Sequence, residues 1–89
     1  QLRKVHAWLS ARPANRVVFT GHTDSDGSEE YNADLSLRRA QAVISWLVAN
    51  GVDEPRMSAL GLGEKAPVAS NFTAHGKALN RRVEVKRSP

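Results

Sequence analysis

Apolar residues recur at helical spacing between positions 40 and 48 of this 89-residue chain. A stripe at i, i+3, i+4, i+7 and i+8 gives a helix one core-facing side, and here it consists of Ala40, Val43, Ile44, Leu47 and Val48. The spacing predicts a helix over residues 35–50. Asp34 or Ser36 is its expected N-cap, and Gly51 is the expected left-handed residue beyond its end. Gly21 and Gly27, before this helix, are expected to allow turns that a side chain would block.

Apolar segments on both sides of this helix predict strands at residues 16–20 (RVVFT), 56–63 (RMSALGLG) and 81–86 (RRVEVK). Helical spacing at residues 1–11, ended by Pro13, predicts a first helix, and residues 73–79 predict one helical turn after a long loop. The order is helix, strand, helix, strand, loop, strand. We therefore expect one α/β domain over residues 1–89, an α+β sandwich with its helices packed on one face of the sheet.

The composition excludes some classes of protein and leaves others open. A formal net charge of +4 permits an anionic partner such as nucleic acid, an acidic polymer or a membrane surface, but selects none. The absence of cysteine excludes a disulfide framework and thiolate metal sites. No apolar run approaches the roughly 20 residues that span a bilayer. Because the chain begins with Gln1, we expect a fragment of a longer protein, with any membrane anchor upstream.

Residues 21–40, GHTDSDGSEEYNADLSLRRA, hold most of the polar side chains that could form a site. Counted from Asp24, the glycine and glutamate of a calcium-binding EF-hand loop are out of register, because Gly27 is fourth and Leu35 is twelfth. The histidines are not at zinc-binding spacing. We expect neither a metal nor another cofactor.

A catalytic site has little support in the same stretch. Asp24 with Asp26 could form an acid–base pair, and His22 could activate a serine. The chain nevertheless has no nucleophile elbow, no glycine-rich phosphate cradle and no recognisable triad order. We expect a protein that is not an enzyme.

A receptor for a zwitterion fits the stretch better. Asp24 follows a predicted strand and Arg39 lies in the next helix, so both should meet at the carboxyl end of the sheet, where open α/β folds bind ligands. Asp24 would take an ammonium group and Arg39 a carboxylate, with Thr23 and Asn32 nearby. An internal ion pair between Asp24 and Arg39 explains the spacing equally well, and both interpretations stay open here.

Five segments in order, GHTDSDG, YNADLSLRRAQAV, GLGEKAPVASN, TAHG and NRRVEV, strongly resemble the OmpA-like C-terminal domain. The resemblance covers about residues 14–87. This family includes porin tails, peptidoglycan-associated lipoproteins and the periplasmic part of flagellar stator proteins. The resemblance implies a βαβαββ-type mixed sheet and non-covalent binding of peptidoglycan in the periplasm, through meso-diaminopimelate of the stem peptide. It also implies an envelope protein tethered to the outer or inner membrane.

The resemblance also assigns roles to single residues. Asp24 of the GHTD motif would receive the ligand's ammonium, and Arg39 of the helix motif would hold its carboxylate. The remaining residues that would line or close the pocket are Thr23, Asn32, Leu35, Asn80 and Arg81. Strand alternation supports Arg81 over Arg82, because Arg81 shares a face with Val83 and Val85, which should pack on the helices.

The sequence departs from the family at its start. The family's domain opens with a strand before the first helix, and that strand is missing here, so we expect an N-terminally truncated domain with three of the four strands. The fragment could fold with a weakened site, or a dimer or strand-swapped partner could cover the exposed sheet edge. Three alternative functions remain: a basic nucleic-acid-binding domain, a wall hydrolase, and a structural envelope domain that has lost ligand binding.

Overall fold

The computed structural model describes residues 2–88 of the chain. In chain order these residues form α1 (Leu2–Ala11), β1 (Arg16–His22), α2 (Glu29–Ala49), the 3-10 turn η1 (Glu54–Arg56), β2 (Met57–Gly63), α3 (Ala74–Asn80) and β3 (Arg82–Ser88). Every predicted helix and strand is present and in the predicted order. Gln1, which the sequence pattern places in the first helix, lies outside the described residues.

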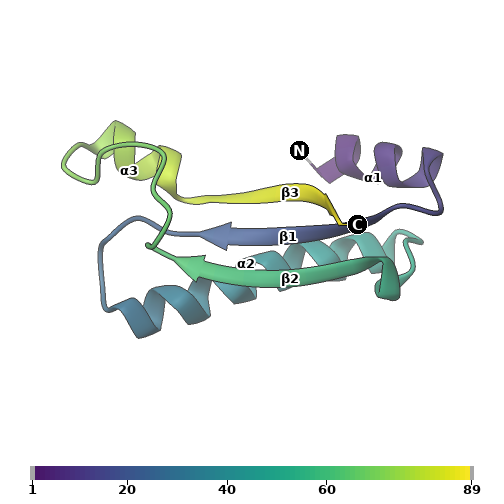
Figure 1. Cartoon of the computed structure of the whole chain (residues 1–89), viewed down its shortest axis with the longest axis horizontal. Helices are drawn as coiled ribbons and strands as arrows, with labels where there is room; N and C mark the ends of the chain where they lie inside the picture. Colours follow the sequence, from purple (N-terminus) through teal and green to yellow (C-terminus); the bar gives the residue numbers. More distant parts are fainter. Residues whose placement is uncertain (1, 89) are drawn as a thin grey trace.

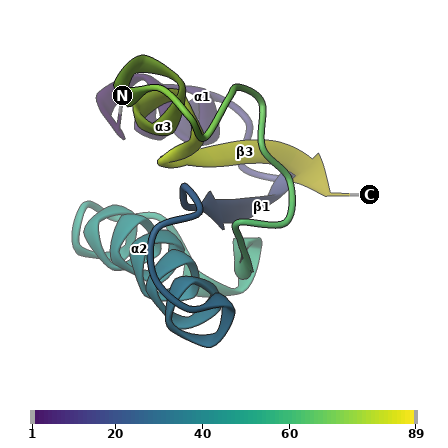
Figure 2. The same cartoon turned by 90° about the vertical axis from the view of Figure 1, so that its left-hand side faces the viewer.

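The three strands within residues 2–88 form a mixed sheet in the order β2-β1-β3. The central strand, β1, runs parallel to β2, with Val17 opposite Met57, and antiparallel to β3, with Phe19 opposite Val85. Seen from one end, α1, α2 and α3 lie on the same side of the sheet (Figure 2). The predicted α/β fold with helices on one face is therefore confirmed.

The core lies between this sheet and the first two helices. Fully or almost fully buried apolar side chains come from α1, β1, α2, β2 and the turn after α2, namely Leu9, Val17, Phe19, Ala40, Ile44, Leu47, Val52 and Met57. Three members of the predicted α2 stripe belong to this set. Val43 packs against it partly buried, and Val48 is 42% exposed, so the stripe is narrower at its end than the spacing predicts.

The start of α2 was wrongly predicted. The helix begins at Glu29, six residues before residue 35, and its N-cap is Ser28 instead of Asp34 or Ser36. The Ser28 hydroxyl accepts a hydrogen bond from the Tyr31 amide at 3.1 Å. The first turn is polar because it lies outside the core, and its acidic residues Glu29 and Glu30 favour the positive end of the helix dipole. The apolar stripe therefore marks only the packed part of the helix.

Turn residues follow the predictions at two of three glycines. Gly51, just beyond α2, has φ +95°, and Gly27, in the loop before α2, has φ +91°, both in the left-handed region. Gly21, which was also expected in a turn, lies inside β1 instead, because this strand runs two residues beyond the predicted end at Thr20.

At one end of the molecule the chain brings several elements together (Figure 1). The carboxyl ends of β1 and β2, the first turns of α2, and α3 with the start of β3 all lie at the left of that view. Polar loops connect them there, and α1 lies at the opposite end. None of the helices within residues 2–88 is long and apolar enough to cross a membrane.

Candidate functional site

The loop that follows β1 is tied to the neighbouring strand. The Thr23 amide donates to the Gly63 carbonyl at 2.9 Å, at the end of β2. The Thr23 hydroxyl donates to the Asp24 carbonyl at 2.8 Å. The side chains of Thr23 and Asp24 are both buried. Together with the two hydrogen bonds, this burial holds the Asp24 carboxylate at the end of the sheet.

Both carboxylate oxygens of Asp24 have a donor inside the protein. Oδ1 accepts from the Asp26 amide at 3.0 Å, and Oδ2 accepts from Arg81 Nη1 at 2.6 Å. Burial alone would raise the pKa of Asp24, but the Asp26 amide and the Arg81 guanidinium together hold this pKa below its ordinary value. Asp24 is therefore a stable carboxylate at neutral pH and already has a cationic partner.

Asn32, in the first turns of α2, holds the loop between β1 and α2 in place by hydrogen bonds. Its Nδ2 donates to the carbonyls of Asp24, at 3.3 Å, and Asp26, at 2.9 Å, and to Glu64 Oε1 at 3.1 Å. Glu64 follows β2 and was not among the predicted site residues. Its only sequence signal is its position after the second strand, at the same end of the sheet.

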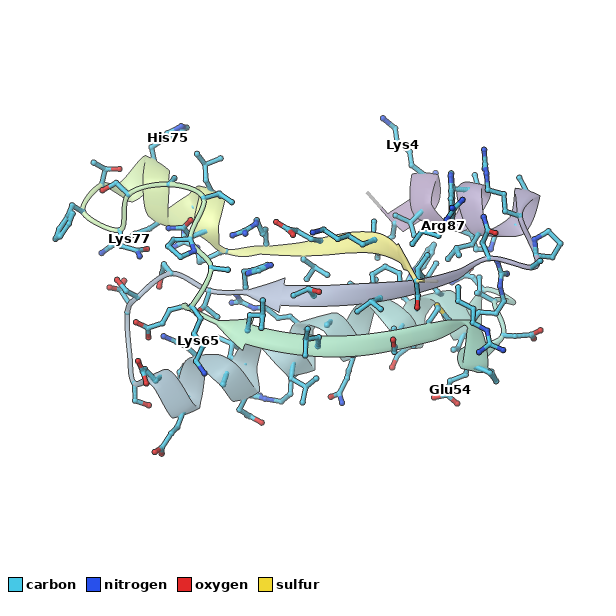
Figure 3. All side chains as sticks on the ribbon, viewed as in Figure 1. Lys4, Glu54, Lys65, His75, Lys77 and Arg87 are labelled. Atoms are coloured by element: carbon cyan, nitrogen blue, oxygen red, sulfur yellow. The ribbon has the colours of Figure 1, made fainter. Side chains whose placement is uncertain are left out.

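A second ion pair joins the loop to α3. Lys77 Nζ lies 3.3 Å from Asp26 Oδ1, and both side chains are partly exposed to solvent. Figure 3 shows Lys77 and Lys65 among the loops at this end, with Arg87 and Lys4 at the other end. Two carboxylates of the β1–α2 loop thus contact two cations from α3 and the residue after it.

Arg39 does not contact Asp24. Within residues 2–88 no ion pair involves Arg39, so the Asp24–Arg39 bridge left open by the sequence is wrong. Arg39 is exposed on α2 and lines an open depression of about 370 Å³ together with Arg81, Arg82 and Val83. The neighbouring Arg38 instead pairs with Asp34 one turn earlier on the helix, at 2.8 Å.

The two consecutive arginines after α3 have different environments. Arg82, the first residue of β3, donates to Glu84 at 2.8 Å and to the Ala66 carbonyl at 3.0 Å. Arg81 precedes β3 and caps α3, so the predicted strand begins one residue too early. Val83 and Val85 do face the helix side of the sheet, where they line a depression with Val5 of α1, but Val85 is 43% exposed. Because Arg81 lies before the strand, strand alternation does not decide its direction.

Asn80 is placed for a supporting role. Its Oδ1 accepts from the amides of Val68 and Ala69 at 2.8 and 3.0 Å, and its Nδ2 donates to the Ala69 carbonyl and to Asn71 Oδ1. The side chain has no exposed surface, so it shapes the loop over residues 68–71. Leu35, another predicted pocket residue, is half-buried on α2.

The site therefore combines a buried, ionised carboxylate with exposed guanidinium groups at the end of an α/β sheet. In residues 2–88 no group of three or more His, Asp and Glu side chains is placed to hold a metal ion. An ammonium group can be accepted by Asp24 and a carboxylate by Arg39 and Arg81. Such a site, on a two-layer α/β domain, has the chemistry to bind a ligand that carries both charges.

The comparisons with known proteins identify the family. Residues 1–81 match the OmpA family. The chain is 48% identical over 81 residues to the probable lipoprotein YiaD of Escherichia coli K12, covering 91% of this chain and 37% of that protein. It is 46% identical over 84 residues to the peptidoglycan-binding protein ArfA of Mycobacterium tuberculosis, covering 94% and 26%. The chain belongs to the OmpA family.

Solved structures agree with this assignment. The peptidoglycan-associated lipoprotein of Burkholderia pseudomallei superposes with a TM-score of 0.91 at 33% identity, over 98% of this chain and 74% of that one. The cell wall anchor of the type VI secretion system of Pseudomonas aeruginosa superposes with a TM-score of 0.82 at 38% identity, over 94% and 61%. The chain spans only part of the length of its sequence relatives: between 24% and 37% for YiaD, the outer membrane porin F of Pseudomonas fluorescens and ArfA of Mycobacterium bovis.

Proposed function

We propose that this domain is a non-catalytic peptidoglycan-binding module that anchors an envelope protein to the cell wall in the periplasm. Its ligand is the stem peptide, held through the amino-acid centre at the end of the meso-diaminopimelate side chain. Membership of the OmpA family supports the general function, as do a relative named as a peptidoglycan-binding protein and a structural neighbour named as a cell wall anchor.

The observation that carries the ligand assignment is the placement of opposite charges at one end of the sheet. The Asp24 side chain is 8% exposed and ionised, whereas Arg39 is exposed and has no ion pair within the described residues. The outer centre of meso-diaminopimelate carries an ammonium and a carboxylate on the same carbon. Its ammonium binds Asp24, and its carboxylate binds Arg39 in the open depression.

Calorimetric titration with the tripeptide L-Ala-γ-D-Glu-meso-diaminopimelate tests this assignment. Asp24→Asn and Arg39→Gln should each weaken binding at least about 30-fold. Asp24→Asn leaves the ligand ammonium without an anionic partner, and Arg39→Gln removes one of the cations that hold the ligand carboxylate. Arg38→Gln is the matched control: it removes the same charge from the adjacent position, where the arginine pairs with Asp34. Unchanged affinity in the Asp24 and Arg39 variants would contradict the ligand assignment.

Sedimentation with purified peptidoglycan sacculi tests the general function separately. The wild-type domain should pellet with sacculi, and soluble fragments should not increase during incubation. Release of fragments by the domain would instead indicate a hydrolase.

A further inference from the structure

Arg81 occupies the position that the proposed function assigns to the ligand's ammonium. Its guanidinium lies 2.6 Å from Asp24 Oδ2, and the Asp26 amide takes the other carboxylate oxygen. An ammonium group that binds Asp24 strongly must therefore displace Arg81 from a short, charge-assisted contact. The candidate cation site is closed by a residue of the protein itself.

The surroundings of Arg81 allow its side chain to leave Asp24 without unfolding the site. The Arg81 amide remains tied to the Lys77 carbonyl at 3.1 Å, whereas the side chain is 44% exposed. The same side chain lines the depression that Arg39 also lines. The long arginine side chain can therefore rotate from Asp24 toward the depression while the backbone stays at the end of α3.

The two states differ in the charge of the depression. With Arg81 on Asp24, the uncompensated cation in the depression is Arg39, because Arg82 is neutralised by Glu84. Displacement of Arg81 by a ligand ammonium leaves Arg39 and Arg81 together without an anion. An ammonium alone thus exchanges one ion pair for another and adds repulsion between two guanidinium groups.

We propose that Arg81 is a specificity-determining gate that admits an ammonium to Asp24 only when a carboxylate on the same ligand receives the displaced guanidinium. This inference rests on the proposed function. A zwitterionic centre forms three attractive contacts for the one it breaks: its ammonium replaces Arg81 on Asp24, and its carboxylate binds both Arg81 and Arg39. The gate therefore selects diaminopimelate stems over lysine stems, whose side chain ends in an ammonium without a carboxylate.

The test compares two tripeptides that differ by that single carboxylate, L-Ala-γ-D-Glu-meso-diaminopimelate and L-Ala-γ-D-Glu-L-Lys. Dissociation constants are measured for the whole wild-type chain and for Arg81→Gln, Arg81→Lys, Arg39→Gln and Arg87→Gln. Arg87 lies at the opposite end of β3 and controls for the lost charge (Figure 3). Heteronuclear NMR spectra confirm that each variant is folded.

Wild type should prefer the diaminopimelate peptide by at least about 30-fold. In Arg81→Gln the lysine peptide should bind more tightly than in wild type, because Asp24 is open, and the preference should fall below about tenfold. The preference of Arg81→Lys should lie between those of wild type and Arg81→Gln, because the lysine ammonium can still pair with Asp24 but lacks the planar guanidinium fork. Arg39→Gln should weaken the diaminopimelate peptide without improving the lysine peptide, and Arg87→Gln should match wild type.

The outcomes distinguish a failure of the gating role of Arg81 from a failure of the proposed function. If wild type binds the diaminopimelate peptide, but neither position 81 variant binds the lysine peptide more tightly than wild type does, the gate is wrong and the proposed function stands. If wild type binds neither peptide, the proposed ligand is wrong and the gate is rejected with it.

Discussion

His22 Nε2 lies 3.6 Å from Glu84 Oε1, too far for a hydrogen bond, although His22 is almost fully buried at the end of β1. Within residues 2–88, neither ring nitrogen of His22 has a hydrogen-bond partner. Glu84 is instead held by Arg82, the residue opposite His22 in the sheet, at 2.8 Å. Burial, and then the nearby Arg82 charge, lower the pKa of His22, while Glu84 opposes this shift.

A buried histidine of this kind should make the fold sensitive to mild acid. The pKa of His22 is near 6.5 in the unfolded chain and lower in the folded protein. As the pH falls through 6.5, the unfolded state therefore binds more protons than the folded state does. We expect the free energy of unfolding to fall by about 1 kcal/mol between pH 7.5 and 5.5, and this slope to flatten in His22→Leu. Urea denaturation at the two pH values measures both quantities.

Removal of exposed His75 provides the control. His75→Ala should keep the wild-type pH slope, and at pH 7.5 His22→Leu should be as stable as wild type or more stable, because it removes buried polar atoms that have no partner. Equal slopes in wild type and His22→Leu would contradict the assignment of the acid sensitivity to this residue.

The four hydrogen bonds of Asn80 should make it a structural residue. Asn80→Ala leaves the Val68 and Ala69 amides without their acceptor, and we expect a loss of about 2–3 kcal/mol in the free energy of unfolding. Amide hydrogen exchange should also become faster over residues 68–71. Asn50→Ala, which removes an exposed asparagine bonded to the Trp46 carbonyl, should cost less than about 1 kcal/mol. Similar losses in both variants would contradict the structural role.

Local patterns in the sequence predict the elements well and their long-range pairings poorly. The alternation in β2 and the stripe in α2 are set by burial of neighbouring residues, so periodicity is sufficient to find them. The partner of Asp24 lies 57 positions away, and no local pattern distinguishes Arg81 from Arg39 as that partner. Spacing along the chain favours Arg39, whereas the turn between α3 and β3 brings Arg81 to the carboxylate.

Gly21 shows the same limit at the level of one residue. The sequence suggests a turn there, but the glycine lies inside β1 with the backbone of α2 directly against it. A β-carbon at this position would overlap the Ser36 carbonyl. No local signal indicates this contact, because it depends on how closely the helix approaches the sheet.

Gly21→Ala should therefore destabilise the domain by forcing α2 away from β1. We expect a loss of at least about 2 kcal/mol by urea denaturation, in the range of overpacked cores. Gly51→Ala is the matched control: Gly51 has φ +95° but no atoms near its missing β-carbon, so only backbone strain of about 1 kcal/mol should appear. A smaller loss at position 21 than at position 51 would show that α2 can shift easily.

The early start of α2 can be tested through its cap. Ser28→Ala removes the hydroxyl that accepts from the Tyr31 amide, and it should lower the free energy of unfolding by about 1 kcal/mol. The Tyr31 amide should exchange faster with solvent in the same variant. Ser45→Ala changes an exposed serine in the middle of α2 and should stabilise the domain by a few tenths of a kcal/mol, because alanine has the higher helix propensity. If both variants gave the same small gain, α2 would begin later, near the position that its apolar stripe alone predicts, and Asn32 would lose the helical placement that holds the Asp24 loop.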